Sequence, residues 1–194
     1  DPVHSGEIKL EGETVRFKSP RDAIARGIML CPEDRKEQGL ILQRSIRDNV
    51  TMPVLSQLRK GIFLDRKSET ALAKEAVRKY SIRTPSVEMQ VMQLSGGNQQ
   101  KTILGRWTSE KIETKILILD EPTKGIDVGT KAEVYQMVCD FAKQGIGVIF
   151  ISSELTEVLN VSDNIIVMHN GHITGRVSRA EATEENVLEM AMRI

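Results

Sequence analysis

Residues 94–101 read LSGGNQQK and residues 115–123 read KILILDEPT, and these two stretches decide the fold. In the second stretch a run of apolar residues predicts a buried strand, and Asp120 and Glu121 follow at its carboxyl end. Ligands of open α/β sheets bind beyond the carboxyl ends of the strands. An Asp at that edge can bind Mg²⁺ through water, and the next Glu can polarise the water that attacks a terminal phosphate. An acidic turn after an ordinary strand is the alternative, and this stretch alone leaves it open.

The first stretch predicts the start of a helix that faces an anion. Ser95 can cap the helix, and Gly96 and Gly97 leave their N–H groups open to a ligand. Aligned backbone donors and the positive end of the helix dipole both favour a phosphate. A helix with an ordinary Ser cap is the alternative, because Ser-Gly-Gly alone is common.

Composition narrows the class of protein. A chain of 194 residues can form one domain, or one domain with a small subdomain. Lys+Arg 27 equals Asp+Glu 27, so no basic surplus points to nucleic acid. No apolar run approaches the roughly 20 residues that cross a bilayer. Cys31 and Cys139 lie far apart in apolar runs, which indicates buried free thiols.

The pattern of apolar residues predicts an α/β fold. Strands that alternate with helices, and strands that are continuous apolar runs, favour a parallel sheet covered on both faces. We expect a hairpin at residues 7–10 and 14–17, helices at 20–25, 45–50, 66–80, 97–109, 131–142, 154–159 and 184–192, a loop at 33–38, and strands at 27–31, 115–119, 147–151, 164–168 and 172–177. The last two strands, joined by Asn170-Gly171, are expected to finish the sheet. The α/β core would comprise residues 1–44 and 115–194, with a helical subdomain at about 45–114.

Together with GIDVGTK at residues 125–131, the two stretches resemble the ATP-binding cassette of ABC transporters, and the resemblance covers essentially the whole chain. PEDRK at residues 32–36 and LGRW at 104–107 are similar to the second, C-terminal cassette of bacterial arabinose, ribose and galactose importers. The resemblance implies a P-loop NTPase-like ABC ATPase core with an inserted helical subdomain, which carries the signature helix.

The resemblance also implies roles for individual residues. Two such cassettes meet head to tail, so that Ser95, Gly96, Gly97 and Gln99 would contact ATP held by the other cassette. In this chain's own site, Asp120 would hold Mg²⁺ and Glu121 would be catalytic. Asp127 would sit at the seam between the cassettes, and it can also cap a helix that starts near Val128.

Three departures from the family pattern are visible. No GxxxxGK[ST] occurs in the 194 residues, so the loop that cradles phosphates is expected to be missing. Glu33 stands where the family usually has a glutamine, and it is either a contact to a membrane subunit or one charge in a solvated loop. Ser153 stands where a catalytic histidine is usual, and a hydroxyl cannot polarise water as an imidazole can.

These features predict the ATP-binding subunit of a bacterial monosaccharide importer, an ABC-type sugar-transporting ATPase (EC 7.5.2 class) with ATP and Mg²⁺ as cofactors. It would lie peripherally on the cytoplasmic face of the inner membrane. Its partners would be a second cassette, permease subunits and, indirectly, a periplasmic sugar-binding protein, with no nucleic acid.

Two other functions remain open. A non-catalytic pairing and regulatory cassette would complete the partner's ATP site without hydrolysing ATP itself. A soluble ABC protein of DNA repair or translation is disfavoured by the neutral net charge. The first residues, 1–15, are typical of the middle of a β-meander, so we expect a piece of a longer protein that is inactive in isolation. The sequence does not identify the sugar.

Overall fold

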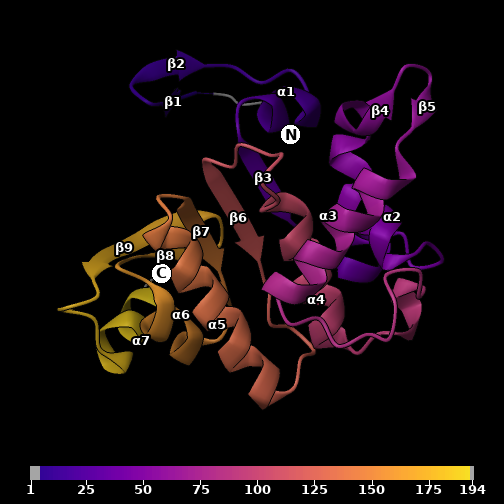
Figure 1. Cartoon of the computed structure of the whole chain (residues 1–194). Coiled ribbons are helices and arrows are strands. Elements are labelled where there is room, and N and C mark those ends of the chain that lie inside the picture. The colour runs from indigo at the N-terminus through magenta and orange to yellow at the C-terminus, as the bar shows by residue number, and fades with distance from the viewer. Residues whose placement is uncertain (1–4, 193–194) are drawn as a thin grey trace.

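A computed structural model describes residues 5–192 of the chain (Figure 1). A three-stranded parallel sheet lies at its centre, in the order β3 (Ile28–Cys31), β6 (Ile116–Asp120) and β7 (Gly147–Ile151). All three strands were predicted from their apolar runs, and their carboxyl ends meet at one edge because they are parallel. Residues 1–4 of the predicted β-meander lie outside the described residues.

Only one face of the sheet is covered within the described part of the chain. Helices α4 (Gly96–Trp107) and α5 (Val128–Lys143) contribute to a core with Leu117 and Leu119. On the other face, Leu30 is 50% exposed and Ile149 is 50% exposed. The prediction of a sheet covered on both faces is therefore wrong for these residues. Continuous apolar strands show that both faces are hydrophobic, but they do not show which residues cover each face.

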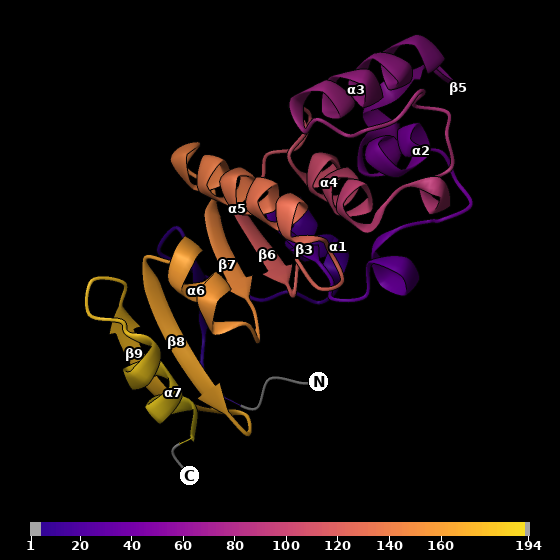
Figure 2. The same cartoon turned by 90° about the horizontal axis from the view of Figure 1, so that it is seen from below.

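A helical region lies beyond the β3 side of the sheet (Figure 2). It contains α2 (Ile46–Thr51), α3 (Arg66–Lys79) and α4, together with 3₁₀ turns at Met52–Leu58 and Val91–Gln93. Leu72, Ala73, Ala76 and Tyr80 bury one side of α3, as its periodicity predicts. A hairpin of β4 (Arg59–Lys60) and β5 (Phe63–Leu64) was not predicted.

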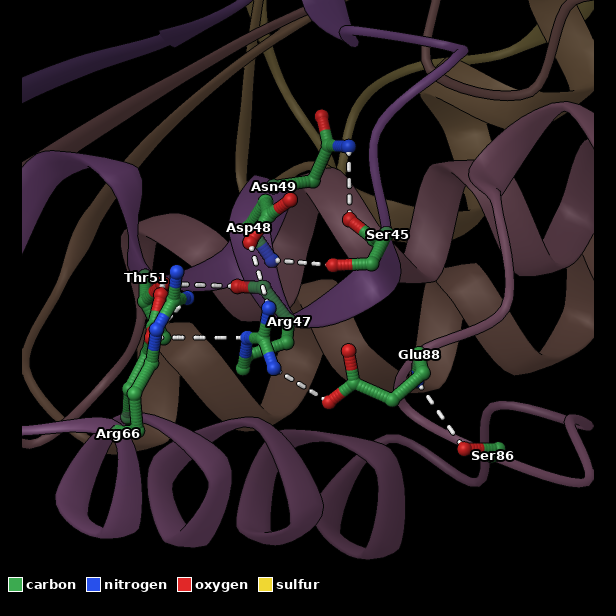
Figure 3. A network of polar contacts seen from close by, with 9 residues as sticks. Ser45, Arg47, Asp48, Asn49, Thr51, Arg66, Ser86 and Glu88 are labelled. Carbon is green, nitrogen blue, oxygen red and sulfur yellow. Dashed lines mark hydrogen bonds and ion pairs between the residues drawn. The ribbon is translucent and has the colours of Figure 1, made fainter.

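A polar network ties the helices of this region together (Figure 3). Arg47 donates to Glu88 at 2.5 Å and lies 3.5 Å from the buried carboxylate of Glu69. Glu69 also accepts from Thr51 at 3.1 Å and from Arg66 at 2.9 Å. A buried carboxylate requires such partners, because an unpaired one would cost several kcal/mol, on the order of 3–5.

The N-terminal elements follow the prediction. Strands β1 (Ile8–Leu10) and β2 (Glu13–Val15) form the antiparallel hairpin, and α1 (Pro20–Ala25) follows with Ser19 as its cap. Residues 33–38, predicted as a loop, instead contribute to one π-helical turn at Arg35–Gly39. The side chain of Asp34 accepts from the amides of Lys36 and Glu37, which stabilises this turn.

The C-terminal elements form a separate small layer beyond β7 (Figure 2). Strands β8 (Asn164–His169) and β9 (His172–Ser178) pair only with each other among the described residues, so the prediction that they finish the main sheet is wrong. Asn170 and Gly171 both have positive φ, 46° and 81°, which suits a tight two-residue turn. Helices α6 (Leu155–Val161) and α7 (Glu184–Met192) pack on the hairpin through a core that includes Ile165 and Val187.

Candidate functional site

Asp120 and Glu121 stand at the carboxyl edge of the sheet, as predicted. Asp120 is the last residue of β6, and its carboxylate makes no hydrogen bond or ion pair among residues 5–192. Glu121 has φ of 44°, a left-handed conformation that is costly for a residue with a side chain. Its amide donates to Ile151 O at 2.9 Å, so the chain turns sharply while it remains attached to β7.

Ser153 follows β7 and lies directly beside Glu121. The Ser153 amide donates to Glu121 Oε1 at 2.7 Å. The contact therefore comes from the backbone of Ser153 and not from its hydroxyl, the group that stands where an imidazole is usual. One oxygen of the Glu121 carboxylate is engaged in this way, and the other has no protein donor in the described structure.

The start of α4, formed by Ser95, Gly96 and Gly97, is the glycine mouth of the helix, and no side chain among residues 5–192 caps its backbone amides. Ser95 occupies the N-cap position, but its hydroxyl accepts from no backbone amide of the helix, contrary to the predicted cap. It accepts instead from the side chain of Asn98 at 2.9 Å. The first-turn amides of a helix have no acceptor within the helix, so those of Gly96 and Gly97 stay available as donors to an anion.

Gln99 lies behind this mouth. It is 4% exposed, donates to Val91 O at 3.2 Å and accepts from Arg35 Nε at 3.4 Å. Its side chain is therefore engaged inside the protein. A cavity of about 370 Å³ opens next to it, and the lining includes Arg35, Lys36, Gly96 and Gly125.

Asp127 caps α5, which begins at Val128 as predicted. Its carboxylate accepts from Thr130 N at 3.0 Å and from Thr130 Oγ1 at 2.8 Å, and these hydrogen bonds hold the pKa of Asp127 below its usual value. Thr130 in turn packs against Gly97. The segment that follows Glu121 thus reaches the glycine mouth. The structure therefore brings together two predicted motifs, residues 94–101 and residues 125–131.

Glu33, which lies just before the π turn, contacts the same segment. Its carboxylate accepts from Lys124 Nζ at 2.5 Å, and this hydrogen bond raises the pKa of Lys124. Arg35, which the sequence reasoning did not select, donates to Lys124 O at 2.6 Å and to Gly125 O at 3.3 Å. The run of charges at residues 33–38 predicts a loop, and the fold places this stretch against residues 124–125.

Glu157 is a further buried residue next to the site, and the sequence pattern does not indicate it. It is 1% exposed, and its carboxylate accepts from Thr123 at 2.5 Å, Ser152 at 2.8 Å, Tyr135 at 2.9 Å and Lys131 at 2.9 Å. Burial alone would raise the pKa of Glu157, but these hydrogen bonds outweigh it and hold the pKa below the ordinary value. No local pattern marks this Glu, because its partners come from three other segments of the chain.

The arrangement fits magnesium and a triphosphate in part. Mg²⁺ keeps most of its water and commonly takes one or two carboxylates together with phosphate oxygens, which the open carboxylate of Asp120 can satisfy. Among the residues that the structure describes, no group of three His, Cys, Asp or Glu residues is placed to hold a metal ion. The uncapped mouth of α4 supplies donors of the kind that bind a phosphate group.

Comparison with known proteins gives a consistent family. The model of the ABC transporter family matches residues 1–124. The arabinose import ATP-binding protein of Mannheimia succiniciproducens is 49% identical over 194 residues, covering 99% of this chain and 38% of that relative. A Rhizobium etli protein, provisionally named as a ribose/galactose/methyl galactoside import ATP-binding protein, is 44% identical over 98% of this chain and 36% of its own length. The chain thus spans a little over a third of these relatives.

Solved structures agree on the fold. A dimeric ATP-binding cassette in a post-hydrolysis state, with ADP and Pi bound, superposes with a TM-score of 0.73 at 18% identity, covering 92% of this chain and 75% of that one. A nucleotide-free cassette of an ABC transporter gives a TM-score of 0.75 at 20% identity, covering 96% of this chain and 74% of that one. These matches confirm the predicted ABC ATPase fold. In residues 5–192 every helix is too short or too polar to cross a bilayer.

Proposed function

The chain belongs to the ABC transporter family, and from this premise we propose that it is the ATP-binding part of a bacterial monosaccharide importer. In the complete importer, ATP hydrolysis would drive sugar uptake through a membrane permease, with a periplasmic protein delivering the sugar. The cassette would lie peripherally on the cytoplasmic face of the inner membrane. Residues 1–44 and 115–194 would form its α/β core, and about 45–114 its helical subdomain.

The observation that carries this proposal is the uncapped mouth of α4 beside the start of α5. Ser95 leaves the first-turn amides free, and Gly97 lies against Thr130, next to the cap residue Asp127. We propose that this surface closes head to tail over the terminal phosphate of ATP held by a second cassette. Free amides and the helix dipole favour that negative charge, and Asp127 would lie at the seam.

This chain's own site, at the carboxyl edge of the sheet, would use Asp120 and Glu121. Bound Mg²⁺ would neutralise the charge that develops on the transferred phosphoryl group. Asp120 would hold the metal through water, and the free oxygen of Glu121 would orient the attacking water. The Ser153 amide keeps the other oxygen of Glu121 in place at 2.7 Å.

A second function is favoured by a specific observation, namely that Ser153 meets Glu121 through its backbone amide. Ser153 offers no imidazole, and no GxxxxGK[ST] occurs in these 194 residues. The cassette would then be a non-catalytic pairing and regulatory module that completes the partner's ATP site. The 194 residues alone should bind Mg-ATP with a Kd of about a millimolar or weaker, because a phosphate loop supplies most of the direct phosphate contacts. Calorimetry that gave a micromolar Kd would contradict this.

Whether the cassette hydrolyses ATP or only completes the partner's site, Glu33 would contact the permease. Glu33 is exposed just before the π turn and is bound to Lys124, so a partner that draws Glu33 away would also disturb the segment that leads to Asp127. Charges at the rim of an interface mainly fix orientation and partner choice.

The test uses the whole protein, assembled with its permease. Ser95→Arg places a long side chain over the glycine mouth, and sugar-stimulated ATP hydrolysis should fall by more than about tenfold. Ser56→Arg, at an exposed serine of the Met52–Leu58 turn, is the matched control. Unchanged hydrolysis in the Ser95 variant would overturn the proposal.

Glu121→Gln then separates the two functions. A large loss of ATP hydrolysis indicates a working site in this chain, and no loss indicates the pairing role.

A further inference from the structure

We propose that Glu157 is a positioning residue for Glu121: a buried carboxylate that holds the two chain segments on either side of the catalytic candidate. The inference rests on the proposed function in that Glu121 must take part in turnover. Glu157 itself touches neither substrate nor metal in this scheme.

The first segment is the turn after β6. Glu121 adopts φ of 44° there, and such a conformation costs about 1–2 kcal/mol for a residue other than glycine. It persists only where the surroundings hold it. Thr123, two residues further on, is 1% exposed and donates to Glu157 Oε1 at 2.5 Å. The turn is thereby attached to α6, although the two are distant in sequence.

The second segment is the end of β7. Glu121 meets it twice, through its amide at Ile151 O and through its carboxylate at the Ser153 amide. Ser152 lies between these two contacts, and its hydroxyl donates to Glu157 Oε2 at 2.8 Å while accepting from the Glu154 amide at 3.0 Å. Each oxygen of Glu157 therefore holds one of the two segments that position Glu121.

The first helix turns of α5 complete the set. Lys131 donates to Glu157 at 2.9 Å, and Tyr135 donates to the same oxygen at 2.9 Å. A buried carboxylate with four donors is fixed in one orientation, because rotation would leave several of them unpaired. Glu157 thus links the Glu121 turn, the helix capped by Asp127 and the turn that contains Ser153.

The test compares turnover of the whole protein with its permease in a double-mutant cycle. Glu157→Gln should lower kcat by about 10–100-fold and leave KM within about twofold, because a small misplacement of a catalytic group acts on the chemical step. Combined with Glu121→Gln it should cause no further loss. Glu154→Gln is the matched control, since Glu154 also binds Lys131 but its side chain contacts neither Thr123 nor Ser152. Ser152→Ala removes one donor to Glu157 but keeps the charge of its carboxylate, and it should lower kcat by a smaller factor. This variant replaces Glu157→Gln in the test if Glu157→Gln does not fold.

Amide exchange gives a readout that does not depend on activity. The Glu121 and Ser153 amides should exchange at least about tenfold faster in Glu157→Gln than in Glu154→Gln, while the amides of α4 should not change. The inference is overturned if these two amides keep their protection, or if the losses from Glu121→Gln and Glu157→Gln multiply. Full turnover in Glu121→Gln would overturn the role of Glu121 and this inference with it. A protein that never hydrolyses ATP would refute the proposed function, and amide exchange would still decide whether Glu157 holds these segments.

Discussion

Gly97 on α4 and Thr130 on α5 lie so close that a β-carbon on Gly97 would stand 2.2 Å from Thr130 Cγ2. The approach brings the glycine mouth against the first turn of α5, where Thr130 also donates to the cap residue Asp127. The glycine at this position is therefore required for packing as well as for an open mouth.

Gly97→Ala should destabilise the protein by about 1–3 kcal/mol, because the new methyl group overpacks the contact with Thr130. In an unobstructed helix the same change would be favourable by about 0.5–1 kcal/mol. Gly129→Ala is the control, since its β-carbon would meet Asp127 Oδ1 at an ordinary 3.5 Å. Denaturant unfolding measures the stability of both variants. Added to the Gly97→Ala protein, Thr130→Ser should restore part of the lost stability, because it removes the nearest methyl group. A Gly97 variant as stable as the Gly129 variant would contradict the packing.

Arg35→Ala should release the π turn from the segment at Lys124 and Gly125. Arg35 donates to both of their carbonyls and to Gln99, and burial lowers its pKa against the opposing effect of Asp34. We expect amides in residues 35–39 to exchange at least about tenfold faster, since charged hydrogen bonds contribute about 1.5–3 kcal/mol. Lys36→Ala, at an exposed neighbour, should leave exchange unchanged. Equal protection in the two variants would rule out this attachment.

Cys31 and Cys139 should differ sharply towards a thiol reagent. Cys31 is fully buried, and burial raises the pKa of its thiol to about 12 against the opposing effect of Arg106. At pH 8 only about one part in ten thousand would be thiolate, which is the reactive form. Cys139 is half-buried, so one thiol should react in the native protein and both after unfolding. Mass spectrometry of the labelled peptides identifies the site, and rapid labelling of Cys31 would contradict its burial.

Apart from the side-chain cap expected at Ser95, the local parts of this site could be predicted from sequence, and the long-range parts could not. The strand that ends at Asp120, the cap at Asp127 and the glycine mouth each depend on a few neighbouring residues. Arg35 and Glu157 act on partners 89 and 34 residues away. Neither residue type nor periodicity reveals such partners, because the tertiary fold alone brings them together. Charged residues are usually exposed, so the sequence alone would predict exposed side chains for both Arg35 and Glu157.

Two of the errors in the fold are also long-range, and a third is local. Apolar runs predicted every strand of the main sheet, but they do not say what covers residues such as Ile149 or Leu30. The Asn170-Gly171 turn correctly predicted a hairpin, yet a turn signal carries no information about which sheet the hairpin joins. The π turn formed because the side chain of Asp34 satisfies two amides, a local contact that the run of charges concealed.

Arg106→Met should be among the most destabilising changes in α4. The Arg106 side chain is 4% exposed and donates to Gly39 O at 2.6 Å, Asn49 O at 2.7 Å and Asn49 Oδ1 at 3.1 Å. Methionine would fill much of the volume but leave the backbone carbonyls of Gly39 and Asn49 buried without the Arg106 donors, at a cost of about 2–4 kcal/mol. Asn49 Oδ1 would keep its other donor, the Ile41 amide at 2.9 Å. Denaturant unfolding should show this loss, whereas Arg16→Met, at an exposed position, should change stability by less than about 0.5 kcal/mol. Similar stability of the two variants would show that water reaches these carbonyls.

Acid should remove the stabilisation that Glu157 provides. Because hydrogen bonds from Thr123, Lys131, Ser152 and Tyr135 outweigh burial, the pKa of Glu157 in the folded protein lies below its ordinary 4.5. Such a group stabilises the fold fully above its unfolded pKa, and this contribution is lost as pH falls through the folded pKa.

At pH 7, Glu157→Gln should therefore be less stable than the wild type by about 3 kcal/mol, the cost of breaking a buried charged pair. The difference should stay constant down to about pH 5 and then shrink as the wild-type carboxyl takes up its proton. Glu154→Gln also removes a carboxylate that binds Lys131, but at an exposed position, and its small effect should lack this dependence. Denaturant unfolding from pH 3 to 8, on the order of one pH unit per step, measures both variants. A difference that grew towards acid would mean that burial raises the Glu157 pKa above the unfolded value and that the four donors do not hold the carboxylate ionised.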